Sequence, residues 1–131
     1  MLLESANTAG GDADRPLEAL QDLVSWCAVN QNRFWGRHDR QPNGEPRVPH
    51  GGWSGVWGDG DDWTVIAVTG LTLRNQLESQ GHHPPEIISR WAGRDWLVKS
   101  GSRPSRTVRL DGQPTRCYCI SREAIDLALI D

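Results

Sequence analysis

Hydrophobic residues recur at helical spacing near the start of the chain, between residues 15 and 33. Asp14 can cap a helix there, and Pro16 is tolerated in its first turn. Residues 1–13 are small and polar, so we expect a disordered leader before one domain that spans residues 14–131. The apolar side chains on one face of this predicted helix are Leu17, Leu20, Val24, Cys27 and Ala28.

The spacing of apolar residues changes after this helix. Residues 36–50 contain three prolines and no apolar periodicity, which predicts a long loop. The runs GGWSGVW and WTVIAV follow, separated by an Asp/Gly turn, and they predict a Trp-rich β-hairpin. Trp53 and Trp57 are four residues apart, so we expect their side chains to share one face of a strand.

Two short helices are predicted after the hairpin. The segment LTLRNQLESQG favours a helix that Thr69 or Thr72 can cap and that Gly81 ends. After the turn at His82 and His83, PPEIISRWAGRDW favours a second helix, because proline is tolerated in a first helical turn. Two helices joined by such a short turn form a helix-turn-helix unit.

The remaining segments predict strands and one last helix. WLVK, RTVRL and TRCYCI have strand character, and the loops SGSRPS and DGQP separate them. A small sheet after a helix-turn-helix is typical of the wing of a winged helix. Ser121 can cap the final helix, REAIDLALI. The predicted fold class is therefore α+β: a winged helix-turn-helix domain with an N-terminal helix and a Trp-rich β-hairpin.

The second helix of the pair has an apolar face and a polar face that carries Arg90 and Arg94. In a helix-turn-helix this helix enters the major groove, where arginine can contact guanine or phosphate. The predicted contacts to DNA or RNA from the helix and the wing hairpin are Arg90, Arg94, Lys99, Arg103, Arg106 and Arg109. The alternative is an ordinary solvated helix face, since Glu86 stands four residues before Arg90.

Charge is distributed unevenly along the chain. The formal net charge is −3, which does not suggest a polyanion ligand. However, the stretch from Arg90 to Arg116 holds seven basic and two acidic residues, whereas residues 1–62 hold ten acidic and five basic residues. Such asymmetry between halves can mark a nucleic-acid surface.

The order of motifs resembles the C-terminal region of phage and integrative-element ATPases that carry the domain of unknown function family 927. The segments GHHPPEIISRW, DWLV, RPSRTVRL and RCYCI carry the resemblance, which covers about residues 17–120. It implies an accessory winged-helix domain of a helicase- or primase-like replication protein of a mobile element. The chain has no P-loop motif, and its only lysine is Lys99, so ATP hydrolysis is not carried over. The domain would belong to a longer ATPase or act beside one.

Other chemistry is less well supported. Cys117 and Cys119 are two residues apart, which is not the usual spacing of a zinc site even if His82 and His83 contributed, and a buried apolar pair is favoured. Cys27 lies on the apolar face of the first helix. No serine stands in a nucleophile-elbow motif. We therefore expect no catalytic site, no cofactor and no metal.

Tryptophan content suggests a second function. Seven tryptophans are more than a core of this size readily buries, and Trp26, Trp35, Trp53 or Trp57 could remain partly exposed. The alternative function is thus a protein-interaction or oligomerisation module that docks on an ATPase partner. Neither a signal peptide nor a membrane span is evident, so we expect a cytoplasmic protein without a membrane partner.

Overall fold

The computed structural model describes residues 14–129, and it has the mixed α+β composition predicted from the sequence. The predicted leader, residues 1–13, lies outside the described residues. The elements, in chain order, are α1 (Arg15–Val29), the 3-10 turn η2 (Gln31–Arg33), β2 (Phe34–Trp35), β3 (Gly55–Trp57), β4 (Val65–Thr69), α2 (Gly70–Ser79), α3 (Pro84–Gly93), β5 (Arg106–Leu110), β6 (Gln113–Ser121) and α4 (Arg122–Leu129).

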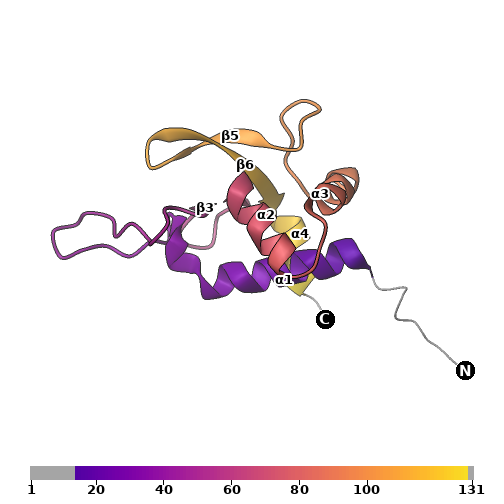
Figure 1. The fold of residues 1–131 in the computed structure, drawn as a ribbon. Helices are drawn as coiled ribbons and strands as arrows, with labels where there is room; N and C mark the ends of the chain where they lie inside the picture. Colours follow the sequence, from indigo (N-terminus) through magenta and orange to yellow (C-terminus); the bar gives the residue numbers. More distant parts are fainter. Residues whose placement is uncertain (1–13, 130–131) are drawn as a thin grey trace, which may run out of the picture.

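Five strands form one sheet in the order β2-β3-β4-β6-β5. The edge pair β2 and β3 is parallel, and the other neighbours are antiparallel. The strand β6 is the longest and joins the two halves, because its C-terminal part pairs with β4 and its N-terminal part pairs with β5. The predicted hairpins β3–β4 and β5–β6 are both present, and in Figure 1 the β5–β6 hairpin extends above the helices.

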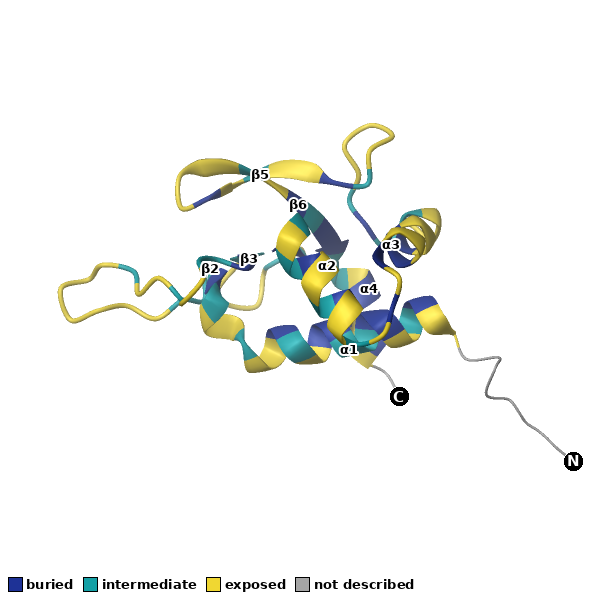
Figure 2. Cartoon of the chain, in the orientation of Figure 1, coloured by how far each residue is buried: buried dark blue, intermediate teal, exposed yellow. Residues whose placement is uncertain are grey.

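All four helices contribute to one core on a single face of the sheet. The pairs Val68–Tyr118 and Ile66–Ile120 of β4 and β6 present side chains to this core. In each helix, the residues buried on this side of the sheet are those of its apolar stripe (Figure 2). The largest side chains in the core with almost no exposure include Trp91, Phe34, Leu20, Leu23, Leu73, Leu77 and Ile87.

The opposite face of the sheet holds a smaller apolar cluster. Ala67, Cys117 and Cys119 are buried there, and partly buried valines surround them. The alternation along β6 explains the separation, since Cys117 and Cys119 point away from the helices while Tyr118 and Ile120 point toward them. The C-x-C pair is therefore a pair of packed small side chains, as expected from the sequence.

Helix caps predicted from the sequence are formed. The side chain of Asp14 accepts a hydrogen bond from the amide of Leu17 at 3.3 Å, and Thr69 accepts one from Thr72 at 3.3 Å. The Ser121 hydroxyl oxygen accepts the amide of Ala124 at 3.2 Å. These bonds satisfy amides that have no partner within the first helical turn.

Two helices are shorter than their sequence patterns predict. α1 ends at Val29 rather than near residue 33, because Asn30 leaves helical geometry and its side chain donates to the carbonyl of Trp26 at 2.8 Å. α3 ends at Gly93 rather than at Trp96, and Asp95 adopts a φ of 60°, which an α-helix does not allow.

The prediction that Trp53 and Trp57 share a strand face is wrong. β3 begins only at Gly55, and Gly52, with a φ of 92°, turns the chain just before Trp53. Trp57 is buried in the main core, 5.9 Å from the ring of Phe34. Trp53 instead packs edge-on against Trp35 at 5.4 Å and against His38 at 5.2 Å.

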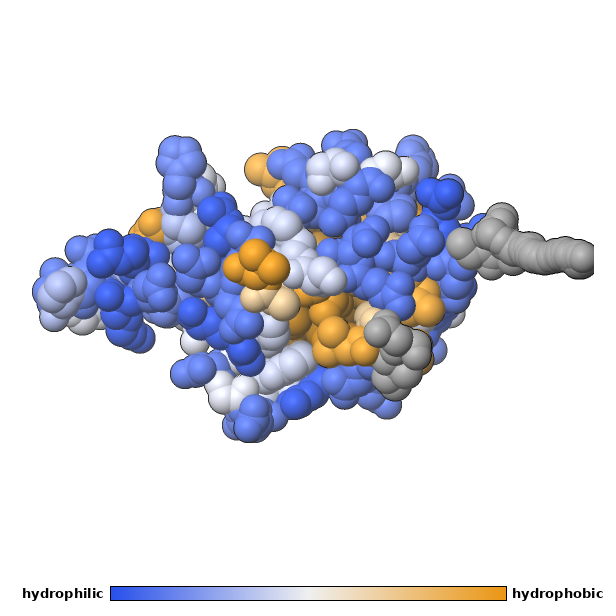
Figure 3. Space-filling view, turned by 90° about the horizontal axis from the view of Figure 1, so that it is seen from below, coloured by the Kyte–Doolittle hydropathy of each residue, from blue (hydrophilic) through white to orange (hydrophobic). Residues whose placement is uncertain are grey.

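The surface seen from the side of α1 and α4 is mostly hydrophilic, with a hydrophobic patch toward the middle of this face (Figure 3). The strongly exposed apolar side chains of these two helices are Val29, Leu127 and Leu129. Within residues 14–129, no helix combines the length and the hydrophobicity needed to cross a membrane.

Candidate nucleic-acid interface

The helix α3 presents the two faces that its sequence predicts. It begins at Pro84, where a missing amide hydrogen is tolerated, and Ile87, Ile88 and Trp91 are buried against the other helices. Ala92 is half-buried. The polar face of the helix consists of exposed residues: Glu86, Ser89, Arg90 and Gly93. Arg94, which follows the last helical residue, is also exposed. Figure 2 shows this outward face as exposed.

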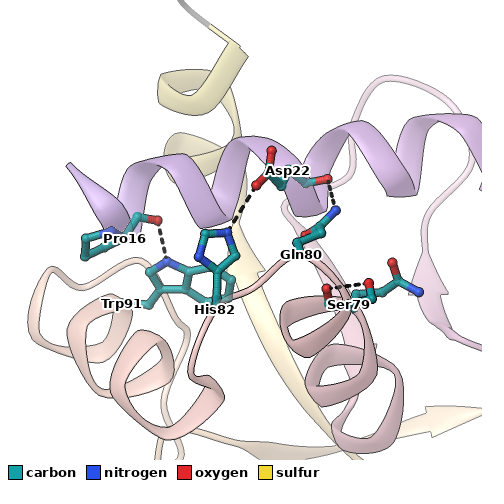
Figure 4. Close-up of polar contacts among 7 residues, drawn as sticks. Pro16, Asp22, Ser79, Gln80, His82 and Trp91 are labelled. Atoms are coloured by element: carbon teal, nitrogen blue, oxygen red, sulfur yellow. Dashed lines mark hydrogen bonds and ion pairs between the residues drawn. The ribbon is translucent and has the colours of Figure 1, made fainter. Parts of the chain in front are cut away.

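Polar contacts tie α3 and the turn between α2 and α3 to α1. The indole nitrogen of Trp91 donates to the carbonyl oxygen of Pro16 at 2.8 Å. In the turn between α2 and α3, Nε2 of His82 lies 3.1 Å from a carboxylate oxygen of Asp22, and Nε2 of Gln80 donates to the Asp22 carbonyl at 3.5 Å. Figure 4 shows these three side chains directed at one side of α1. The orientation of the outward face of α3 is therefore fixed.

Arg90 is the most exposed cation of this helix. Its side chain is 63% exposed, and its guanidinium lies 3.9 Å from the Glu86 carboxylate, at the limit of an ion pair. Exposed pairs of this kind contribute well below about 1 kcal/mol, so Glu86 does not hold Arg90 away from a ligand.

Arg94, in contrast, is engaged within the fold. Its Nη1 lies 2.9 and 3.0 Å from the two carboxylate oxygens of Asp14, and its guanidinium lies 4.9 Å from the centre of the Trp96 ring. The hydrogen bond from Arg94 lowers the pKa of the Asp14 carboxyl below its usual value of 3.8. Arg94 thus joins the end of α3 to the start of α1.

Lys99 and Arg103 do not lie on the β5–β6 hairpin that the sequence analysis interpreted as a wing, contrary to the prediction. The hairpin consists of β5 and β6, which begin at Arg106, and both residues lie in the preceding loop, 99–105. The predicted strand WLVK is also wrong, because this segment forms only an isolated bridge between Leu97 and Ile120. The amides of Ser100 and Arg103 each donate to the other's carbonyl at 3.0 Å, which closes the loop into a tight turn.

This loop nevertheless brings two cations to the side of α3. In Figure 1 the loop between α3 and β5 rises beside α3. Lys99 lies 3.7 Å from Asp95, which is an exposed partner, and Arg103 has no carboxylate within ion-pair distance among residues 14–129. The loop 99–105, which carries Lys99 and Arg103, therefore lies at the same end of the molecule as α3.

Arg106 and Arg109 occupy different places on β5. Arg106 pairs with Cys117, on the sheet face that the helices do not cover. Its positive charge favours the thiolate of Cys119 and so opposes the rise in the pKa of that thiol. Arg109 is on the other face of β5, and its guanidinium donates to the carbonyl of Gly112 in the hairpin turn at 2.8 Å. Figure 1 places this turn at the end of the sheet opposite α3. The six predicted cations therefore do not form one patch.

Two exposed arginines near the hairpin were not among the predicted contacts. Arg116 lies beside Thr107 in the β5–β6 register and donates to the Ser105 hydroxyl at 3.1 Å. The guanidinium of Arg74 on α2 lies close to Gly70, beside the ring of Tyr118. Antiparallel pairing of RTVRL with TRCYCI would have placed Arg116 on the same face as Arg109, but nothing in the sequence indicates the position of Arg74.

The cysteines have the environment of core residues. Burial raises the pKa of the Cys27 thiol to about 12, and burial together with the neighbouring Cys119 raises that of Cys117 to about 12. Burial also raises the pKa of Cys119, although the charge of Arg106 opposes this. The region 14–129 contains no cluster of three or more His, Cys, Asp or Glu side chains that could hold a metal ion.

None of the seven tryptophans is in the exposed class. Trp57 and Trp91 are buried, and the other five are half-buried. Most belong to aromatic pairs, such as Trp57 with Trp63 at 5.7 Å and Trp26 with Phe34 at 6.2 Å. The strongly exposed apolar side chains are aliphatic: Val29, Val48, Leu71, Leu127 and Leu129.

Comparison of the chain with known protein families and with curated proteins gave no match.

Proposed function

We propose that this chain is a winged-helix domain that binds DNA or RNA through α3 and the loop that follows it, without catalysis of its own. The order of elements supports the fold. Two short helices joined by a tight turn are followed by the antiparallel hairpin β5–β6, and β4, which precedes the two helices, pairs with β6. In such a domain the second helix of the pair is the one that enters the major groove.

The outward face of α3 is the observation on which this function rests. α1 and the helix-turn-helix turn fix the orientation of α3, and Arg90 extends from it with no strong internal partner. Lys99 and Arg103 add positive charge from the adjoining loop. A guanidinium on such a face can contact guanine or phosphate, whereas the loop cations are suited to phosphate. Arg94 contributes by holding α3 against α1 rather than by contacting the ligand.

A salt titration with a short DNA duplex tests this function. Contacts to about three phosphates should give a slope of roughly −3 for the logarithm of the binding constant against the logarithm of salt concentration. Association that does not depend on salt, or no association at micromolar protein, would contradict the proposal.

A pair of arginine variants locates the binding surface. Arg90→Ala should weaken DNA binding by about tenfold, since it removes the basic side chain of α3 itself. Arg47→Ala is the matched control, because Arg47 is exposed in the long loop 36–50, which Figure 1 shows at the opposite end of the molecule from α3. Equal losses in both variants would show that binding follows overall charge and not α3.

The sequence resemblance alone suggests a role in mobile-element replication. In that setting the domain would hold nucleic acid for a helicase- or primase-like ATPase that is a separate domain or partner. A gene for such an ATPase beside this one, or a longer protein that contains both, would support this part of the proposal. Adding the chain to that ATPase should then stimulate its DNA-dependent hydrolysis, and an unchanged rate would count against it.

A further inference from the structure

A polar pocket of about 380 Å³ lies between the C-terminal end of α1, the loop that leads into β3 and the first half of α2. This volume is within the range of small-ligand sites. None of the described residues that line the pocket is acidic, so it suits a neutral or anionic ligand. The side chains that matter for recognition are Trp26, Asn30, Arg33, Asn75 and Gln76.

Arg33 is held in place at the wall of the pocket. Its Nε donates to the hydroxyl of Ser54 at 3.0 Å, and its Nη2 donates to the carbonyls of His50 and Gly52 at 2.9 and 3.3 Å. Within residues 14–129, the hydrogen bonds of the Arg33 side chain come from Nε and Nη2, which leaves Nη1 without one. The guanidinium is therefore preorganised, and one of its nitrogens remains available to an anionic group.

Three carboxamides face the same space with unused hydrogen-bonding capacity. The Asn30 side chain donates to the carbonyl of Trp26 at 2.8 Å, which leaves its oxygen available. In the part of the chain that the structure describes, the side chains of Asn75 and Gln76 have no hydrogen-bond partner. Each carboxamide offers both a donor and an acceptor, which is the combination that reads the edge of a nucleobase.

We propose that this pocket binds one unstacked nucleotide, with its base beside Trp26 and the carboxamides and its phosphate at Arg33. Where that nucleotide is part of a strand, the inference rests on the proposed nucleic-acid function. A base can stack on an aromatic side chain and offer its Watson–Crick edge to hydrogen bonds only when it is unpaired. The pocket would therefore make the protein prefer nucleic acid with unpaired or frayed nucleotides, independently of α3.

Titration of the full chain with adenosine monophosphate, followed by nuclear magnetic resonance, tests the site. We expect saturable shifts of the indole N–H of Trp26 and of the side-chain amides of Asn75 and Gln76. The double variant Asn75→Ala/Gln76→Ala should weaken binding by about tenfold, as expected for the loss of base-edge contacts. Glu78→Gln is the matched control, because Glu78 is exposed on the same helix and does not line the pocket.

The possible outcomes separate the pocket from α3. Binding of adenosine monophosphate that survives Arg90→Ala supports the pocket, whatever happens to duplex binding. If no resonance shifts saturably at millimolar nucleotide while duplex DNA still binds, the pocket inference is wrong and the proposed function stands. If ribose phosphate or a methyl glucoside produces the same shifts as the nucleotide, the site recognises a phosphate or a sugar and the inference is also overturned.

Discussion

The indole nitrogen of Trp91 donates to the carbonyl oxygen of Pro16 across 2.8 Å, and this bond joins α3 to the first turn of α1. Trp91 is also fully buried. Trp91→Phe should therefore lower the free energy of unfolding by about 2 kcal/mol, because it removes a buried hydrogen bond and leaves a small cavity. Urea denaturation measures the change. Trp53→Phe is the control, since Trp53 is only half-buried, and equal losses in both variants would contradict the role of this bond.

The ion pair of Asp14 and Arg94 should make stability depend on acid pH. Arg94 lowers the pKa of Asp14 in the folded protein, so the charged carboxylate stabilises the fold above the unfolded pKa, and this contribution is lost as the pH falls through the lower folded pKa. Asp14→Asn keeps a good helix cap but removes the charge. The free energies of unfolding of the two proteins should differ by less than about 1 kcal/mol at neutral pH, because the pair is partly exposed.

Measurements at acid pH, where the Asp14 carboxylate is protonated, provide the control for this ion pair. The difference between Asp14→Asn and the parent protein should shrink below about pH 4 and disappear at lower pH. A difference that stays constant from neutral to strongly acidic pH would show that the charge of Asp14 is not involved.

Local patterns in the sequence predict much of this fold. The helix α3 shows its apolar stripe directly, and the alternation of RTVRL and TRCYCI predicts the hairpin β5–β6. Contacts between distant residues are not encoded in such patterns. The pair of Arg94 and Asp14 spans 80 residues, and the pocket at Arg33 needs α1, the β3 loop and α2 to come together.

The positions of the basic side chains also could not be predicted from local sequence patterns. Lys99 could be read as a strand residue because WLVK is apolar and contains a β-branched valine, yet this segment forms only a bridge at Leu97, and a turn closed by Ser100 and Arg103 follows it. Charge counts along the chain cannot distinguish an exposed arginine such as Arg90 from one that is engaged within the fold. The sequence therefore predicts the helix that carries the interface more reliably than the residues that make it.

The three thiols should be unreactive in the native protein. Reaction with a disulfide reagent requires the thiolate, and the pKa values of Cys27 and Cys117 are raised to about 12 while Cys119 is also raised and buried. At pH 8 we expect all three to react slowly when the protein is folded and quickly after denaturation. The absorbance of the released thiol measures both rates. Rapid reaction of any one cysteine in the folded protein would contradict the observed packing.

Two glycines should respond in opposite ways to alanine. An added Cβ at Gly93, the last residue of α3, meets no atom within 4 Å, so Gly93→Ala should stabilise the protein by up to about 1 kcal/mol by favouring the helix. At Gly55 the added carbon would overlap the carbonyl oxygen of Ala67 on the neighbouring strand. Since β3 cannot then stay paired with β4, Gly55→Ala should destabilise by about 3 kcal/mol or more.

Thermal unfolding of these two variants measures both effects, and each variant is the other's control for the chemistry of the substitution. A similar fall in Tm for both variants would contradict the difference in packing, because it would mean that Gly55 has as much free space around it as Gly93. Gly93 also lies on the outward face of α3, so its variant can be tested for DNA binding at full stability. Weaker binding by a more stable Gly93→Ala protein would place the ligand in close contact with the backbone of α3, because only a methyl group has been added there.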